Sequence, residues 1–367
     1  MFVFASIGIL ALLIMVHEAG HFAAARLQGI HANRFSIGFG PVVWSYKGKE
    51  TEYALRALPL GGFVGFPDDD PDCPYPLDDP NLLRNRPVLD RAIVMSAGVL
   101  ANLVFAYIVL LTMVVTIGVP TPAQVNPGIF IPNVAPNSPA QVAGIQPGDV
   151  ILQVNDIDFR QVDDSEAADG AIVDFQALVR SNPDSPLNVT LQREGATEVQ
   201  TVEVIPVVPE GLDNPVIGVN LAPNQELSFE TPNGISGILA ASNQAYQRIV
   251  WLNIEGFRQL LGNFQNTAGQ ISGPVGIVKI GAELARDNSP SLFNFAALIS
   301  INLAIINILP LPALDGGHLI FLLLEALRGR RLPKNVEDSV MQAGLVLLLG
   351  LGVVLILKDT LSIVAGG

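Results

Sequence analysis

Four long apolar stretches dominate the pattern of hydrophobic and polar positions along the chain. They lie at about residues 2–16, 92–118, 296–314 and 340–357. The second and fourth can each cross ~30 Å of hydrocarbon, which needs roughly 20 helical residues. The first reaches that length only with residues 17–25, and the third continues past Pro310 and Pro312 into a further apolar run. The pattern therefore predicts a polytopic α-helical membrane protein with four transmembrane helices.

The segments between the apolar stretches predict two parts that contain strands. Residues 33–66 are rich in aromatic and β-branched residues and carry a Lys-Gly-Lys turn signal at 47–49, so a β-hairpin or small sheet is expected. Residues 234–262 have the periodicity of an amphipathic helix. The predicted division is a membrane half at 1–118, a small domain at 119–222, a linker region at 223–292 and a second membrane half at 293–367, whose last span covers 340–362.

Composition supports a membrane location and excludes some functions. The chain is 50% hydrophobic and only 15% charged, against ~25% charged residues in ordinary soluble domains. A net charge of −14 disfavours nucleic-acid binding, which normally needs a basic face. The single cysteine, Cys73, excludes an intrachain disulfide and a Cys-rich metal site. A signal peptide is the alternative for the first stretch, but that stretch lacks a basic start and contains a His-Glu pair.

The distribution of Lys and Arg predicts an orientation. These residues are concentrated in residues 26–91 and 328–339 and are sparse between the second and third spans. Because short cytoplasmic loops carry an excess of Lys and Arg, both segments are expected on the cytoplasmic side. Residues 119–292 are then extracytoplasmic.

The extracytoplasmic segment contains "SPAQVAGIQPGDVI" at 138–151. This stretch resembles the core of PDZ domains attached to bacterial proteases, which implies one α+β domain of that type. Two features depart from the resemblance: "NDIDF" replaces the usual Asn-Gly turn, and residues 161–175 form an acidic insertion. Peptide binding by this domain is therefore one possibility, and filtering of substrates by size is the other.

The sequence His17-Glu18-Ala19-Gly20-His21 places ionisable groups inside the first apolar stretch. On a helix, His17 and His21 lie on one face and can both bind one Zn²⁺, while Glu18 lies close enough to act as a general base. A chance match is the alternative interpretation. However, an unpartnered ionisable residue costs ~2.5 kcal/mol or more at the membrane centre, which favours a functional role.

A catalytic zinc needs a third protein ligand, which should come from another membrane segment at similar depth. The segment "NILPLPALDGGH" at 307–318 offers Asp315 and His318. Its two prolines interrupt the third apolar stretch, and a membrane tolerates such a break only where the backbone is buried in protein or lines a wet cavity. On this reasoning alone, both residues remain candidates.

The HEAGH motif together with N-x-x-P-x-P-x-L-D-G-G at 307–317 resembles the site-2 protease family of intramembrane zinc metalloproteases. The likeness is closest to the bacterial regulator-of-sigma-E protease branch, which cuts anti-sigma factors in the membrane. "SAGVLANLVFA" at 96–106 and "SGPVGIVKIGAE" at 272–283 extend it, although Val99 stands where proline is common. The resemblance implies that each chain binds one zinc ion through three residues. It also implies two further catalytic residues that do not bind the metal. The ligands would be His17, His21 and Asp315, with Glu18 as base and Asn307 orienting the substrate or stabilising the oxyanion.

Two other asparagines and part of the predicted hairpin also receive roles. Asn102 and Asn302 are expected to form hydrogen bonds between membrane helices. The resemblance implies that Gly61, Gly62 and Phe63 hold an unwound substrate by β-strand addition. A purely structural hairpin is the alternative.

The function predicted from the sequence is hydrolysis of peptide bonds within or near the membrane segments of single-span proteins. The partners are then those substrates and the lipid bilayer of a bacterial-type plasma membrane, a thylakoid or an organelle. A non-catalytic membrane scaffold that binds peptides through its small domain is the alternative. A transporter is a third hypothesis, because transporters also use broken helices, but the two halves show no internal repeat.

Overall fold

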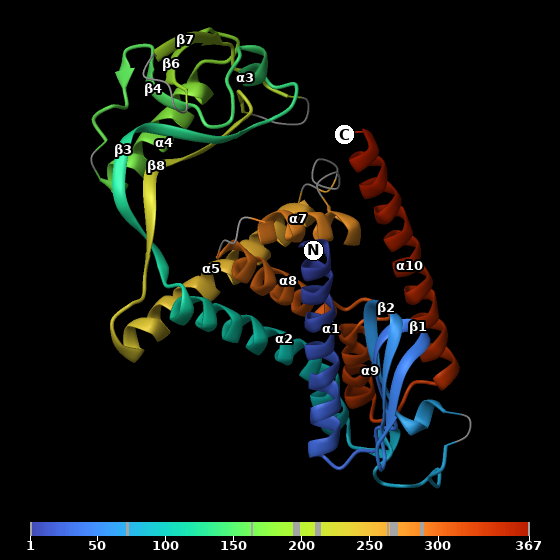
Figure 1. Cartoon of the computed structure of the whole chain (residues 1–367). Helices are drawn as coiled ribbons and strands as arrows, with labels where there is room; N and C mark the ends of the chain where they lie inside the picture. Colours follow the sequence, from blue (N-terminus) through green and yellow to red (C-terminus); the bar gives the residue numbers. More distant parts are fainter. Residues whose placement is uncertain are drawn as a thin grey trace. The chain divides into compact units, whose positions relative to one another are not determined.

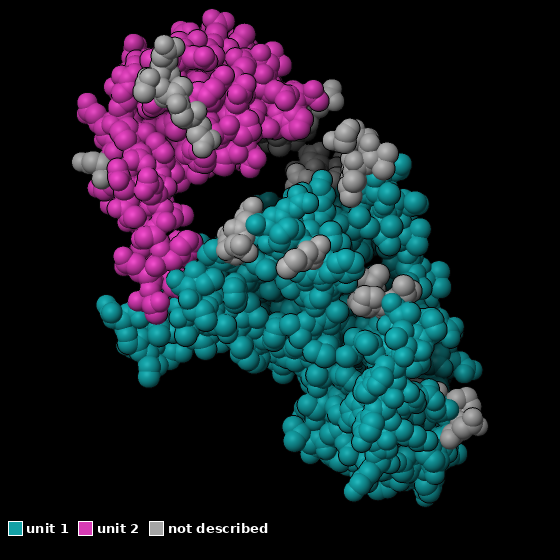
Figure 2. Space-filling model, in the orientation of Figure 1, with its two compact units in different colours: residues 1–117, 232–367 teal, residues 118–231 magenta. Residues whose placement is uncertain are grey.

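The structure of the chain is a computed structural model that describes residues 2–70, 73–162, 164–193, 199–209, 214–262, 264, 271–286 and 290–365. Positions 71 and 72 of the Pro/Asp-rich loop and position 163 of the acidic insertion lie outside these ranges. The chain forms two compact units, one of residues 1–117 and 232–367 and one of residues 118–231 (Figure 2).

Four helices of the first unit are long and apolar enough to cross a membrane, counted over the described residues. They are α1 (Phe2–Leu27), α2 (Val88–Thr116), α8 (Ser291–Ile308) and α10 (Lys334–Ala365). The prediction of four such helices is confirmed. Helices α1, α2 and α8 pack against one another (Figure 1). Close packing of α1 on α2 depends on Gly20, because a Cβ there would stand 2.4 Å from the Ala97 carbonyl oxygen.

The third apolar stretch is interrupted where its prolines predict. Helix α8 ends at Ile308, and α9 (Asp315–Arg328) begins after a short connection. Proline lacks the backbone N–H that would continue a helix, which explains the break. The LDGG sequence therefore begins a separate helix rather than lying within the spanning helix. Gly316 permits this turn, since a Cβ at that position would lie 2.1 Å from the Leu309 carbonyl oxygen.

The predicted sheet over residues 33–66 consists of two long strands, β1 (Arg34–Lys47) and β2 (Glu52–Gly65), whose first segments pair in parallel. Its register shows that both strands fold back on themselves. Residues 34–37 pair in parallel with 52–55 and also pair in opposite directions with 62–65, while 44–47 pair in opposite directions with 52–55. The segment order is thus 44–47, 52–55, 34–37, 62–65, which leaves 62–65 at an edge of the sheet. Helix α1 packs against this sheet (Figure 1).

The loop between β2 and α2 is attached to the sheet by polar contacts. It contains the short 3₁₀ helices η1 (Pro67–Asp69) and η2 (Leu83–Asn85). The Arg34 guanidinium donates to Asp70 over 2.8 Å, and the Arg84 backbone N–H donates to Asp68 over 2.6 Å. Phe66 and Leu82 are buried at the two ends of the loop. The Arg34 contact joins the loop to β1, and the Arg84 contact joins η2 to η1.

Two further helices complete the first unit. Helix α5 (Gly234–Gly262) has the bounds that its amphipathic periodicity predicts, and α7 (Pro274–Arg286) begins within the SGPVGI sequence. The Asp359 carboxylate of α10 accepts hydrogen bonds from the backbone N–H groups of Gly273 and Gly276, at 3.2 and 2.7 Å. The start of α7 is thereby joined to α10.

The second unit is an α+β fold with one six-stranded sheet. Its elements are β3 (Val119–Val134), α3 (Pro139–Val142), β4 (Val150–Val154), β5 (Ile157–Asp158), α4 (Ser165–Ser181), β6 (Leu187–Gln192), β7 (Val199–Val204) and β8 (Val219–Glu230). The strand order is β7-β6-β4-β3-β8, with β5 paired to β4. Helix α4 places Phe175 in a core with Ile129, Ile151 and Leu187. The buried Asp149 carboxylate accepts from the Arg193 guanidinium over 3.2 Å.

Candidate metal centre

The two histidines of the HEAGH motif lie one turn apart on the buried face of α1. His17 and His21 are 8% and 7% exposed, and their Nε2 atoms are 3.2 Å apart. Asp315, the first residue of α9, places its Oδ2 atom 3.2 Å from His17 Nε2 and 3.3 Å from His21 Nε2. Two helices that are remote in sequence thus bring three potential ligand atoms into a nearly equilateral triangle.

The triangle fits a zinc ion. Zinc binds His nitrogen and carboxylate oxygen at about 2.0–2.2 Å, and in a tetrahedral site this sets neighbouring ligand atoms about 3.3–3.5 Å apart. Asp315 Oδ2 is buried and makes no hydrogen bond with acceptable geometry to any described residue, as expected for an atom whose partner is an ion. Three protein ligands also leave one position open, as catalytic zinc sites require. Zinc would therefore be held by His17, His21 and Asp315.

His318, the other candidate ligand, does not join this group. The described residues contain one cluster of His, Cys, Asp or Glu side chains close enough to hold a metal, and it consists of His17, His21 and Asp315. His318 Nδ1 lies 3.9 Å from Glu337 Oε1, and its side chain is 41% exposed. One turn of helix separates it from Asp315, which explains why both were plausible from the sequence.

Glu18 lies between the metal-binding histidines and the edge of the sheet. It lines the same cavity as His17, His21 and Asp315. The Val64 backbone lies near its carboxylate. Gly62 lies against the same side chain, because a Cβ at position 62 would be 2.9 Å from Glu18 Cγ and 3.0 Å from the Ser36 carbonyl oxygen. The sheet edge therefore contacts the residue proposed as base.

Asn307 is the other predicted catalytic residue. It stands in the last turn of α8, and its Nδ2 atom is 3.5 Å from His17 Nε2. The structure therefore places this amide beside the three ligand atoms. Of the predicted substrate-binding residues, Gly62 and Phe63 line the cavity, while Gly61 precedes them with a positive φ of 104°.

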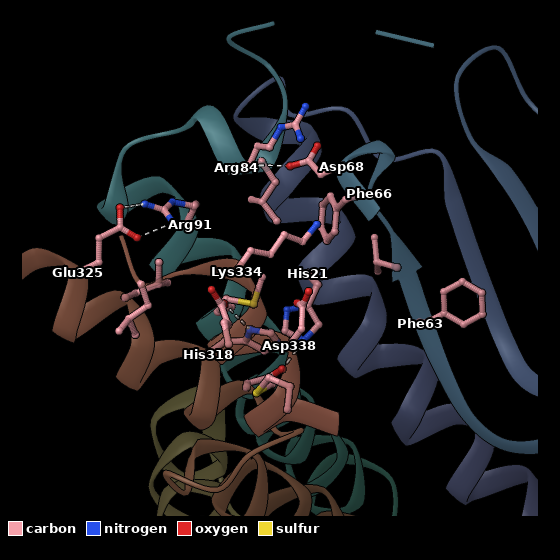
Figure 3. Close-up of a pocket in the computed structure, with 18 of the residues that line it drawn as sticks. His21, Phe63, Phe66, Asp68, Arg84, Arg91, His318, Glu325, Lys334 and Asp338 are labelled. Carbon is pink, nitrogen blue, oxygen red and sulfur yellow. Dashed lines mark hydrogen bonds and ion pairs between the residues drawn. The ribbon is translucent and has the colours of Figure 1, made fainter. Parts of the chain in front are cut away.

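The cavity has a volume of about 600 Å³. Phe63, Phe66 and Leu322 contribute apolar surface to the cavity. Charged side chains line it as well, among them Asp68, Arg84 and Lys334, which lie near Phe66 (Figure 3). Glu325 of α9 accepts two hydrogen bonds from Arg91 of α2, at 3.0 and 2.5 Å, and one from Arg331 at 3.2 Å. A cavity with polar walls that reaches three buried ligand atoms gives water access to the centre.

The structure confirms the predicted hydrogen bond of Asn102 between membrane helices, but sequence reasoning did not predict that α2 contacts both histidines. His21 Nδ1 donates to the Val94 carbonyl oxygen over 2.7 Å, and His17 Nδ1 lies 3.3 Å from Asn102 Nδ2. Gly98 lies between them, and a Cβ there would be 2.3 Å from His21 Nε2. The available signal was the spacing of these three residues at i, i+4 and i+8, which places them on one helix face.

The structure combines four apolar helices with a His-His-Asp centre. The two histidines lie on the first helix and the aspartate lies in the broken third segment, an arrangement typical of a membrane metalloprotease. A family model described as Peptidase family M50 matches residues 5–351. The chain belongs to this family, the site-2 protease family, and is a zinc metalloprotease. This favours an enzyme over the non-catalytic scaffold.

Full-length relatives support the assignment. A Nostoc sp. protein named as a zinc metalloprotease is 53% identical over 364 residues, which cover 98% of this chain and 96% of that protein. A Synechocystis sp. protein with the same description is 53% identical over 359 residues, covering 98% and 94%. The chloroplastic membrane metalloprotease ARASP of Arabidopsis thaliana is 44% identical over 360 residues, covering 98% and 78%.

Proposed function

We propose that this metalloprotease cleaves single-span membrane proteins within or near their transmembrane segments, using His17, His21 and Asp315 as zinc ligands. The observation that carries the proposal is the triangle of ligand atoms with sides of 3.2–3.3 Å. Two of its corners belong to a helix long and apolar enough to cross a membrane. A centre in that position acts on peptide bonds at the level of the bilayer.

The catalytic roles follow from the chemistry of the neighbouring side chains. Zinc, when bound, supplies Lewis acidity that activates water and polarises a peptide carbonyl. Glu18 accepts the proton of the attacking water on its carboxylate and returns it to the nitrogen of the departing amine. The Asn307 Nδ2–H group donates to the carbonyl oxygen as negative charge develops there, a contribution typically worth ~3 kcal/mol.

The sheet edge at residues 62–65 would hold the substrate. A peptide bond inside a helix is inaccessible, so the substrate must unwind before it is cut. Because 62–65 is an edge segment, its outer backbone groups can pair with an extended peptide. Gly62 contacts Glu18, so a peptide added along Gly61, Gly62 and Phe63 would pass beside the base.

Sidedness and the second unit complete the proposal. The concentration of Lys and Arg in residues 26–91 and 328–339 supports a multi-pass topology with these segments in the cytoplasm. Residues 119–292 would then lie outside the cytoplasm.

We propose that the second unit is PDZ-like, with β8 as an edge strand beside α4. In this position it would bind peptide ends or exclude substrates that keep a bulky outer domain.

One experiment tests the proposal directly. The purified full chain is placed in liposomes with a single-span reporter protein, either intact or trimmed to a short outer segment. Mass spectrometry of the products is expected to place the cut within or next to the membrane segment of the trimmed reporter. The Glu18→Gln variant serves as the control for contaminating proteases. Cleavage confined to the soluble flanks, at equal rates for both reporters, would contradict the proposal.

A further inference from the structure

Each histidine that binds a metal through Nε2 carries its proton on Nδ1, and that N–H group needs an acceptor. The acceptor fixes both the tautomer and the direction of the ring. For His21 the acceptor is the Val94 carbonyl oxygen at 2.7 Å. For His17, among the residues that the structure describes, the side chain within hydrogen-bonding distance of Nδ1 is the amide of Asn102. Helix α2 therefore faces the outer nitrogen of both proposed ligands.

The Asn102 amide is fully buried, and one of its two ends has no partner. Its Nδ2 atom lies 3.3 Å from His17 Nδ1, whereas Oδ1 makes no hydrogen bond to any described residue. With Nδ2 facing the ring, Nδ1 must be the acceptor, and the proton then occupies Nε2, the atom that faces Asp315. That tautomer cannot bind a metal through Nε2.

Rotating the amide by half a turn about Cβ–Cγ exchanges its two ends without moving the helix. Oδ1 then occupies the position beside Nδ1 and accepts the Nδ1–H proton, which leaves the Nε2 lone pair directed at the triangle centre. The backbone of Asn102 is held independently, because the Ser300 hydroxyl of α8 donates to the Asn102 carbonyl oxygen over 2.8 Å. Gly98 adds the space that both rings occupy, since its missing Cβ would overlap His21 Nε2 and His17 Cε1.

We propose that Asn102 is a positioning residue of the metal centre: its Oδ1 accepts the His17 Nδ1–H hydrogen bond and directs Nε2 at the ion. Asn102 thus does more than join two membrane helices. This inference rests on the proposed role of His17 as a ligand. It adds that zinc affinity depends on a side chain of α2 that does not touch the metal.

The test measures zinc affinity of the full chain in detergent by competition with a chromogenic chelator. Asn102→Leu keeps the size of the side chain but removes the acceptor, and is expected to weaken zinc binding about 10–100-fold. Asn102→Asp keeps an acceptor and should stay within about 3-fold of the wild-type protein. Ser300→Ala removes only the link between helices α2 and α8, and should also leave affinity within about 3-fold. Zinc affinity unchanged in Asn102→Leu, or lowered equally in Ser300→Ala, would overturn the proposal.

Two further measurements and one further variant keep the result decisive. With Co²⁺ as the probe, the visible absorption of Asn102→Leu should differ from that of the wild-type protein, and Asn102→Asp should restore it. In the zinc-loaded wild-type protein, ¹⁵N NMR of labelled histidine should show His17 protonated on Nδ1, and ligation through Nδ1 would refute the inference even if the variants fail to fold. His17→Ala tests the proposed metal site separately from the role of Asn102. Unchanged zinc affinity in this variant would refute the proposed metal site itself.

Discussion

The backbone of Gly62 lies against the side chain of Glu18, so that a Cβ at position 62 would be 2.9 Å from Glu18 Cγ. The edge of the sheet and the helix that carries the HEAGH motif are therefore in direct contact. The same Cβ would be 3.0 Å from the Ser36 carbonyl oxygen, which belongs to the sheet backbone. A side chain at position 62 must displace either the proposed base or the substrate-binding edge.

Gly62→Ala is expected to lower kcat/KM about 10-fold or more while zinc content stays at one ion per chain. The reason is that a small displacement of a reacting group costs up to ~100-fold in rate. Activity is measured with the trimmed reporter, and zinc by atomic absorption. Gly8→Ala in α1, the helix that carries Glu18, is the control, since a Cβ there meets nothing within 4 Å. Equal activity of the two variants would argue against the contact.

Glu18→Gln should retain zinc and lose cleavage by at least about 100-fold. The amide has the shape of the carboxylate but cannot accept the proton of the attacking water, and general-base catalysis typically contributes ~10²–10⁴-fold. Reporter cleavage and metal content are measured on the same preparation. Near wild-type cleavage by this variant would refute the role of Glu18 as base.

Asp315→Asn and His318→Gln distinguish the two candidate ligands. Asp315→Asn replaces the oxygen that lies 3.2–3.3 Å from both imidazole nitrogens with a neutral group, and should lose most of the bound zinc. His318→Gln should keep its zinc, because His318 is directed at Glu337. Zinc loss in the His318 variant, with zinc retained in the Asp315 variant, would reverse the assignment.

The ion pair of Arg91 with Glu325 is expected to stabilise the cavity wall. Its side chains are 12% and 16% exposed, so Glu325→Gln leaves a mostly buried cation without its charge partner. Breaking buried pairs of this kind costs about 3 kcal/mol, which should lower Tm by several degrees in detergent. The matched control is Arg258→Gln, which removes an exposed ion pair with Glu255 on α5. That control should leave Tm unchanged, and an equal drop in both variants would contradict the prediction.

Local sequence patterns were sufficient for several parts of the fold. The apolar stretches predict the four candidate spans because helix length and hydropathy are properties of one continuous segment. The break before Asp315 follows from Pro310 and Pro312, which cannot donate helical hydrogen bonds. The pairing of His17 with His21 follows from helical spacing alone, since residues at i and i+4 share a face.

Contacts between elements could not be derived in this way. Spacing within 307–318 left Asp315 and His318 both open, and only the family resemblance favoured Asp315. The structure shows the difference directly, because Asp315 lies beside the histidines of α1 whereas His318 lies beside Glu337 of α10. The double pairing that leaves 62–65 at a sheet edge likewise depends on how each strand folds back.

The sequence by itself determined the chemistry of this protein: a zinc-binding helix in a membrane and a second, broken segment with a carboxylate. The tertiary structure decided that Asp315 and not His318 meets the histidines, which backbone edge meets Glu18, and that Asn102 and Val94 of α2 face the outer nitrogens of the histidines. The physical reason is that periodicity specifies a face of one helix, whereas the partner of that face is chosen by the packing of side chains across helices that are distant in sequence.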